Sequence, residues 1–279
     1  MNLDRIKKNV PLNGDRCIST KNGEHFFTDS FVEICILSYA PYSLFENYAL
    51  KHELMPFLSE PRLEKVSRLM LNPREASLSA KHIYALEQSA AAELAICAAM
   101  KKNGRPFAPP DYAYQENGQP TISNGYISIS HTEQHAACAI AGQPVGIDVE
   151  RGHKFSKAVA KRILSPQKEF MSDSTNADEL LSRVWTVKES FLKMTGEGIP
   201  GGMRTLELIA SGGGSSGKWI IKRGTEPKAG CAELLSISDR GNSVGFNCAY
   251  LSVCTREKAT MHINCFESAE SILKFLNEP

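Results

Sequence analysis

The segment Gly146-Ile147-Asp148-Val149-Glu150 alternates apolar and acidic side chains, and this alternation constrains the fold more than any other feature of the chain. In a strand, successive side chains point to opposite faces, so Ile147 and Val149 would face a core while Asp148 and Glu150 share the other face. Same-face residues two apart lie roughly 6 to 7 Å apart at the backbone. Both carboxylates could then hold one hard divalent cation.

A second segment, Trp-Thr-Val-Lys-Glu-Ser-Phe-Leu-Lys at positions 185–193, is expected to lie in a helix over residues 176–194. One apolar stripe with spacings of four, three and four faces a core: Leu180, Val184, Val187 and Phe191. Trp185, Glu189 and Lys193, spaced i, i+4, i+8, fall on the nearly opposite face. Gly196 and Gly198 are expected to end the helix.

Each segment alone has an ordinary structural explanation. An alternating apolar and acidic strand is usually the solvated face of a sheet, and a Glu-to-Lys pair four residues apart is usually a surface ion pair. The two segments together are more informative, because they fix nine or more residue types in order.

With both segments in view, the sequence closely resembles the 4′-phosphopantetheinyl transferases of the surfactin-synthetase-activating type, whose single chain holds two similar halves. The resemblance rests on the G-(I/V)-D-(I/V)-E and W-(S/T)-x-K-E-(A/S)-x-x-K elements, and on Gly118-Gln119-Pro120 followed by a strand that ends in Ser130-His131. It covers about residues 118–198 and is faint elsewhere.

The resemblance implies transfer of the phosphopantetheine arm of coenzyme A to a serine of an acyl or peptidyl carrier protein, with release of 3′,5′-ADP. It implies Asp148, Glu150 and Glu189 as ligands of Mg²⁺, with Mn²⁺ as the alternative, and Glu189 also as the general base, directly or through a metal-bound water. Charge that builds on pyrophosphate oxygens needs such a cation.

The same resemblance implies further site residues. Lys188 and Lys193 would contact phosphates of coenzyme A, and Lys193 and His131 would act in catalysis beside Glu189. Ser130 and His131, at the end of their strand, would also bind coenzyme A. An isolated histidine is more often a surface or core residue, but its place in the Ser-His element favours a phosphate contact.

Two departures from the family pattern concern the nucleotide. Gln119 stands where many relatives have lysine, which removes a charge expected near the adenine or the 3′-phosphate. The stretch 84–100 has no arginine where relatives place a 3′-phosphate clamp. The sequence leaves four replacements open: Lys65, Arg68, Arg74 and Lys81. Weaker affinity for coenzyme A is the other explanation.

Composition is that of a globular enzyme. The 279 residues are 42% apolar and carry a formal net charge of +1, which gives no sign of a nucleic-acid or membrane surface. No signal peptide or membrane-spanning apolar run is recognisable, so a cytoplasmic location is expected. The resemblance implies a monomer, since relatives with both halves in one chain need no partner to complete the cleft. The eight cysteines include no Cys-x-x-Cys pair, so free thiols are expected rather than zinc or disulfides.

The glycine-rich stretch 212–218 has the spacing of a phosphate-binding loop, but it is expected to be a hairpin tip. The next residue is Trp219, where such a loop needs Ser or Thr. Residues 218–222 have the pattern of a strand that would pair with residues 205–209, whereas a phosphate-binding loop must open a helix.

The expected fold class is α+β, with two similar halves that form a pseudo-dimer and hold the active site in the cleft between them. The N-terminal half, residues 1–143, would take the nucleotide side of coenzyme A, with residues 1–30 loosely attached. The C-terminal half, residues 144–279, would carry the metal-binding and lysine motifs. Expected helices lie at 45–55, 61–70, 156–164 and 268–276, besides an Ala-rich helix that ends near 100.

A basic strip of Lys157, Lys161 and Arg162 follows the acidic strand and would steer an acidic carrier protein. A solvated helix face is the equally open explanation.

Two other functions also stay open. One is a non-catalytic module of the same fold that binds coenzyme A or a carrier, and the other is a different metal-dependent phosphoryl transferase.

Overall fold

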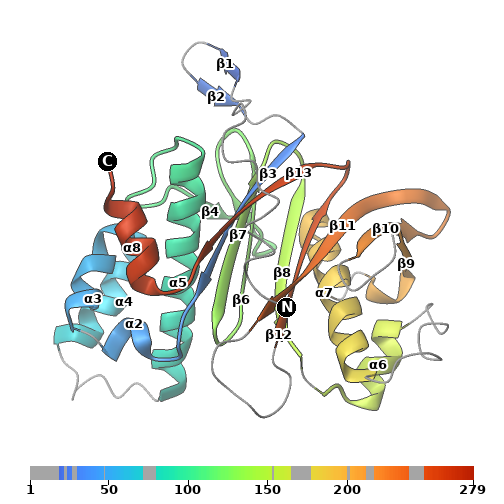
Figure 1. The fold of residues 1–279 in the computed structure, drawn as a ribbon, viewed down its shortest axis with the longest axis horizontal. Coiled ribbons are helices and arrows are strands. Elements are labelled where there is room, and N and C mark those ends of the chain that lie inside the picture. Colours follow the sequence, from blue (N-terminus) through green and yellow to red (C-terminus); the bar gives the residue numbers. More distant parts are fainter. Residues whose placement is uncertain are drawn as a thin grey trace.

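A computed structural model of the chain describes residues 19–21, 24–26, 30–46, 48–71, 80–152, 154–164, 177–199, 202–211, 217–238 and 248–279. Two sheets stand face to face in the middle of the protein, and each is covered on its outer face by helices (Figure 1). The α+β class expected from the sequence is confirmed. The more detailed expectation, that two similar halves form a pseudo-dimer, stays a prediction.

The first sheet has the strand order β13-β3-β7-β6 and is covered by a long helix. Its elements are β13 (Thr260–Phe266), β3 (Phe31–Ser38), β7 (His135–Ala141) and β6 (Tyr126–His131). The helix α5 (Ala80–Lys102) packs on this sheet through a run of buried alanines, because a small side chain lets the helix approach the strands closely.

Shorter elements surround α5 (Figure 1). They are α2 (Ser43–Glu46), α3 (Tyr48–Leu54), the 3-10 turn η1 (Met55–Phe57), α4 (Glu60–Leu71) and α8 (Ala269–Asn277). Two small antiparallel strand pairs lie elsewhere: β1–β2 (Ser19–Lys21 and Glu24–Phe26), which projects beyond the end of the sheets (Figure 1), and β4–β5 (Ala113–Tyr114 and Pro120–Thr121). The helices expected at 45–55 and 61–70 therefore form: α2 and α3 cover described residues of the first, and α4 covers the second.

The second sheet has the order β8-β12-β11-β10-β9. Its strands are β8 (Val145–Arg151), β12 (Cys248–Thr255), β11 (Glu226–Ser238), β10 (Lys218–Arg223) and β9 (Leu206–Ala210), and its outer face is covered by α7 (Ala177–Thr195) and α6 (Lys157–Leu164). The turn η4 (Met203–Thr205) leads into β9. Strands β9 and β10 pair antiparallel, as the hairpin prediction required. The glycine-rich residues 212–216 lie outside the described part of the chain.

The two sheets share an apolar interface, to which β8 contributes Ile147 and Val149. The facing surfaces bring small residues of β7 against branched residues of β8, which allows close packing. The edge strands β6 and β8 also meet directly: the amides of Ile147 and Val149 donate to the hydroxyls of Ser128 and Ser130 at 3.0 and 3.2 Å. Side chains of one sheet thus satisfy backbone donors at the edge of the other.

The end of the chain differs from the expected division at residue 143. Strand β13 pairs in parallel with β3, from Thr260 opposite Phe31 to Phe266 opposite Leu37, and α8 buries its apolar face in the core around α5. The expected C-terminal half is therefore not closed on itself. Partners more than 220 residues apart leave no local signal, and neither β13 nor the long β11 was expected from the sequence.

Two further expectations concern the start of the chain and the membrane. Most of the expected loose segment 1–30 lies outside the described residues. None of the helices in the described residues is long and apolar enough to cross a bilayer.

Candidate active site

Strand β8 and helix α7 carry the two sequence motifs, and they lie against each other. A Cβ at Gly146 would overlap the backbone of α7, at the carbonyl oxygen of Ser190 and 2.5 Å from the amide nitrogen of Met194. Glycine is therefore required here so that the helix can approach the strand. Because Ile147 and Val149 point to the other sheet, Asp148 and Glu150 are left on the face toward α7, as the alternation predicted.

Asp148 is held by groups from both sheets and from the helix. Its Oδ1 accepts hydrogen bonds from Lys193 Nζ at 2.7 Å and from Ser130 Oγ at 2.9 Å. The same Lys193 ammonium donates to Ser130 Oγ at 2.9 Å. Ser130 is buried, and its hydroxyl, which also accepts from Val149, is fully used. Ser130 thus orients Asp148 and Lys193. The sequence had instead predicted that Ser130 contacts coenzyme A directly.

Two carboxylate oxygens in this region are buried without a hydrogen-bond partner, Asp148 Oδ2 and Glu189 Oε1. Burial, with a smaller contribution from the charges of Asp148 and Glu150, raises the pKa of the Glu189 carboxyl to about 7, against the opposing charge of Lys193. Unsatisfied buried oxygens are costly, so they mark a position for a proton or a cation rather than a structural contact.

The three expected metal ligands are not gathered as a complete metal site. Within the residues described, no group of three His, Cys, Asp or Glu side chains could hold a metal ion by itself. The ammonium of Lys193 occupies one oxygen of Asp148. The two unpartnered oxygens nevertheless suit Mg²⁺, which is commonly held by one or two carboxylates together with substrate phosphates and water.

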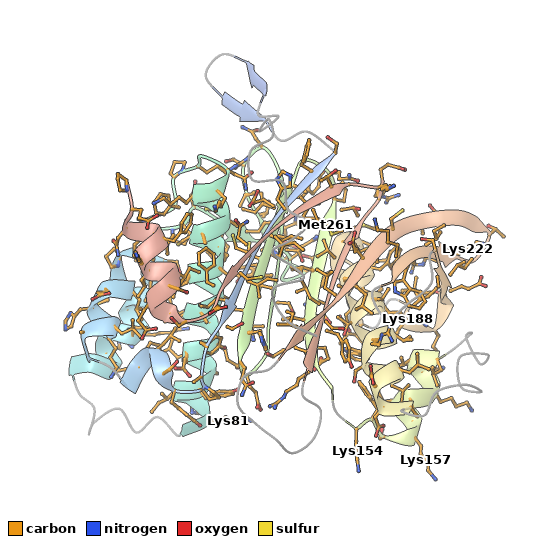
Figure 2. All side chains as sticks on the ribbon, in the orientation of Figure 1. Lys81, Lys154, Lys157, Lys188, Lys222 and Met261 are labelled. Atoms are coloured by element: carbon orange, nitrogen blue, oxygen red, sulfur yellow. The ribbon has the colours of Figure 1, made fainter. Side chains whose placement is uncertain are left out.

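Lys188 does not lie at this site, contrary to the expected phosphate contact. It is completely buried, and its ammonium donates to the carbonyl oxygens of Ile163 at 2.7 Å and Met203 at 3.0 Å. Figure 2 shows Lys188 inside the protein, whereas Lys157 on α6 extends outward. Burial lowers the pKa of Lys188 to about 7. One position along a helix rotates a side chain by about 100°, which takes Lys188 away from Glu189.

His131 lies at the end of β6, next to Ser130, with its side chain exposed at the surface. Partial desolvation, and then the charges of Lys193 and Arg62, lower the pKa of its imidazole, although a backbone hydrogen bond opposes them. The basic side chains of His131 on β6, Lys193 on α7 and Arg62 on α4 are thus close enough to interact electrostatically. Arg62 was not among the basic residues considered from the sequence, although it lies on α4 together with Lys65 and Arg68. Its Nε lies 3.6 Å from Glu93 Oε1.

The four replacements considered for the missing clamp are not equivalent in the structure. Arg68 pairs on the surface with Glu64, four residues earlier on α4, and Arg74 lies outside the described residues. Arg62 lies on the same helix as Arg68, and its charge contributes to the lowered pKa of His131.

A cavity of about 310 Å³ opens beside the C-terminal end of α7. Its walls include Gln119 and Pro120 from the first half, Tyr126 at the start of β6, and Met194 and Thr195 directly after Lys193. Arg256 is the one formally charged residue among those that line it. Gln119 thus lies beside a cavity, but its side-chain amide donates to the backbone carbonyl of Lys193 at 3.1 Å.

The basic strip lies on the exposed face of α6. Lys157, Lys161 and Arg162 are exposed, while Ile163 and Leu164 of the same helix are buried against α7. Phe155, just before α6, packs against Trp185 of α7 with ring centroids 5.9 Å apart. The strip and the carboxylates are therefore carried by elements that pack directly on each other.

Comparison with known proteins places the site in a family. Residues 144–237 match the model of the 4′-phosphopantetheinyl transferase superfamily. The chain is 32% identical to 4′-phosphopantetheinyl transferase Sfp of Bacillus subtilis (strain 168) over 94 residues, which is 32% of this chain and 42% of that protein. It is 31% identical to 4′-phosphopantetheinyl transferase gsp of Aneurinibacillus migulanus over 88 residues, 30% of this chain and 37% of that protein.

A longer match is to 4′-phosphopantetheinyl transferase psf-1 of Bacillus pumilus, with 27% identity over 168 residues, 58% of this chain and 67% of that protein. The chain thus spans about two-fifths of the length of the first two relatives and two-thirds of the third.

The matched region contains both β8 and α7, and with them the acidic pair, Glu189 and Lys193. Residues 144–237 therefore resemble the 4′-phosphopantetheinyl transferase superfamily in the part of the chain that carries the candidate site. The resemblance to the surfactin-synthetase-activating type, read from the motifs, is confirmed by the relatives of that type.

Proposed function

We propose that this protein transfers the phosphopantetheine arm of coenzyme A to a serine hydroxyl of a carrier protein and releases 3′,5′-ADP. The observation that carries the proposal is the pair of unpartnered buried oxygens, Asp148 Oδ2 and Glu189 Oε1, next to the Lys193 ammonium. Both oxygens lie in the domain that matches the transferase superfamily.

In the proposed step, the serine oxygen forms a bond to the phosphorus that carries the pantetheine arm, and the bond from that phosphorus to the nucleotide oxygen breaks. The electron pair leaves with 3′,5′-ADP. Glu189 takes the serine proton, a role that suits a carboxylate whose pKa lies near 7. Asp148, fixed by Ser130 and Lys193, is held beside the reacting phosphates.

A divalent cation such as Mg²⁺ would be held by Asp148 and Glu189, with Glu150 on the same face, and would neutralise charge on the pyrophosphate. Lys193 supplies a compact positive charge from the protein itself. His131 and Arg62, on the first half, are proposed to contact a phosphate of the same substrate, because the positive charges of Arg62 and Lys193 both lower the pKa of His131, so the three basic side chains lie near one another.

The cavity beyond Lys193 is proposed to take the nucleotide end of coenzyme A. It follows directly along α7, and its wall offers the ring of Tyr126 and the amides of Gln115 and Gln119 for a planar base. The neutral Gln119 is consistent with binding of the base rather than a phosphate at this point.

The proposed partner is an acyl or peptidyl carrier protein that docks beside α6. The exposed strip of Lys157, Lys161 and Arg162 would attract an acidic surface next to the modified serine. Packing of α6 against α7 would place that serine near Glu189.

Mass spectrometry of purified carrier proteins, incubated with this protein, coenzyme A and Mg²⁺, tests the proposal. A carrier should gain the mass of the arm, and both chelation of the metal and Asp148→Ala should abolish the gain. Glu207→Gln, which removes an exposed carboxylate of β9, is the matched control and should leave transfer intact. Binding of coenzyme A without transfer would favour the non-catalytic module, and hydrolysis of nucleotides without a carrier would favour another phosphoryl transferase.

Charge reversal separates docking from chemistry. Lys157→Glu combined with Lys161→Glu should raise KM for the carrier by about threefold to tenfold at low salt, with little change in KM for coenzyme A. The control pair, Lys218→Glu with Lys274→Glu, reverses two exposed lysines away from α6. An equal effect of the two pairs would exclude the strip from the interface.

A further inference from the structure

The C-terminal end of α7 is capped by side chains from the other half of the protein. A helix leaves its last carbonyls without helical partners. Here Gln119 Nε2 donates to the carbonyl of Lys193 at 3.1 Å, and Asn117 Nδ2 donates to the carbonyl of Gly196 at 3.1 Å. We define Asn117 and Gln119 as the amide clamp.

The clamp is held in a short, ordered turn between β4 and β5. The Gln115 backbone amide donates to the Gln119 carbonyl at 2.9 Å, and the Gly118 amide donates to the Gln115 carbonyl at 2.9 Å. The Gln119 backbone amide donates to Asn117 Oδ1 at 3.0 Å. Gly118 has φ of +82°, which favours glycine. The turn therefore presents both amide groups in fixed positions before any ligand is bound.

The helix end is shaped to receive the clamp. Gly196 has φ of +74°, and a Cβ there would lie 2.5 Å from Gln119 Oε1 and 3.2 Å from Asn117 Nδ2. The Gly196 and Glu197 amides close the helix by donating to Lys193 and Leu192. A side chain at position 196 would therefore both strain the backbone and displace the clamp.

The residue whose carbonyl the clamp holds is also the lysine of the candidate site. The Lys193 side chain bonds Ser130 and Asp148 on two different strands, so its placement depends on where α7 ends relative to the first half. We infer that Asn117 and Gln119 are positioning residues that fix Lys193 against Ser130 and Asp148 across the two halves. The inference rests on the proposed transferase function for its kinetic consequence only.

Gln119 also lines the 310 Å³ cavity, so an effect of changing it could come from the cavity. Two variants separate these roles. Asn117 belongs to the clamp and is not among the residues that line the cavity, whereas Gln115 lines the cavity and contributes its backbone to the turn. Asn117→Ala therefore weakens the clamp alone, and Gln115→Leu alters the cavity alone.

The kinetic test compares Gln119→Leu, Asn117→Ala, their double variant, Gln115→Leu and Gln119→Lys. The double variant should lower kcat about tenfold, which corresponds to about 1.4 kcal/mol, while KM for the carrier and the melting temperature change little. Gln119→Lys keeps a donor for the Lys193 carbonyl and should recover most of kcat. Gln115→Leu alters the proposed base-binding wall and should therefore raise KM for coenzyme A rather than lower kcat.

Amide hydrogen exchange over residues 189–199 provides a readout that needs no activity. The double variant should exchange about tenfold faster at the end of α7, because the capping bonds are lost. Unchanged exchange would overturn the clamp. Faster exchange with unchanged kcat, or an equal loss of kcat in Gln115→Leu, would overturn the positioning role. If the wild-type protein transfers nothing, the proposed function fails while the exchange result still decides whether the clamp exists.

Discussion

The two central helices, α5 and α7, bury glutamates in opposite ways. On α5, Glu87 accepts from the amides of Tyr42 at 2.5 Å and Leu44 at 2.8 Å, and so caps the start of α2. On α7, Glu189 is similarly buried, yet its Oε1 is without a hydrogen-bond partner. A buried carboxylate that satisfies backbone donors stabilises the fold, whereas one that is left unsatisfied is available for chemistry.

Glu93 of α5 extends the same contrast. It accepts from the amide of Ser59 at 2.9 Å, the hydroxyl of Ser59 at 2.6 Å and the hydroxyl of Tyr112 at 2.8 Å. Both helices lie on the outer face of a sheet, so burial alone does not distinguish them. The difference lies in whether neighbouring donors surround the carboxylate.

The largest effect is expected from Glu189→Gln. Transfer should fall at least about 100-fold, since a general base is lost, while the free energy of unfolding should stay the same or rise because no structural bond is removed. Mass spectrometry of the carrier and urea denaturation measure the two quantities. A variant that transfers normally would remove Glu189 from the chemistry.

Glu93→Gln should show the opposite result. The amide cannot accept at both oxygens, so the variant should lose about 2 kcal/mol of unfolding free energy, in the range for hydrogen bonds to a charged group. Transfer per folded molecule should fall far less than in Glu189→Gln, since Glu93 is linked to the candidate site only through its ion pair with Arg62. If Glu93→Gln and Glu189→Gln cost similar stability, the distinction between a structural and a chemical glutamate would be wrong.

The pH dependence of stability sharpens the comparison further. The Glu189 carboxyl titrates near 4.5 when unfolded and near 7 when folded, so between these values the folded state binds more protons. The protonated Glu189 carboxyl therefore makes its full contribution to the free energy of unfolding below pH 4.5, and this contribution is lost as the pH rises through 7. Without metal, wild type should lose about 2 kcal/mol relative to Glu189→Gln across this window. Parallel stability curves would contradict the raised pKa.

The smallest effect concerns one lysine from each helix. Lys188 of α7 donates to carbonyls of Ile163 and Met203, and Lys101 of α5 donates to those of Phe275 and Leu276 near the end of α8. Lys188→Met should cost about 1 kcal/mol more stability than Lys101→Met, because water can reach the carbonyls only at the half-buried Lys101. Thermal denaturation measures the difference, and equal costs would indicate that Lys188 is not tightly buried.

Much of the site was predictable because it rests on local periodicity. The alternation in β8 correctly placed Asp148 and Glu150 on one face, and the helix expected at 176–194 was found at 177–195. The sequence also predicted that three carboxylates would gather into a complete metal site, but the described residues contain no such group. Instead, the ammonium of Lys193 bonds one oxygen of Asp148. Spacing along a strand or helix fixes direction, but it does not fix which neighbour arrives from elsewhere in the chain.

The sequence by itself determined the α+β class and the two motif-bearing elements, since these depend on backbone geometry within one element. The order and spacing of the motif residues also indicated the superfamily that residues 144–237 match. Only the tertiary structure decided that Lys188 is internal, that Ser130 orients Asp148, and that Gln119 caps α7. It also decided that β13 joins the first sheet. The physical reason is the same in each case: such contacts join residues 15 to 230 positions apart, where packing and hydrogen-bond satisfaction, rather than local propensity, select the partner.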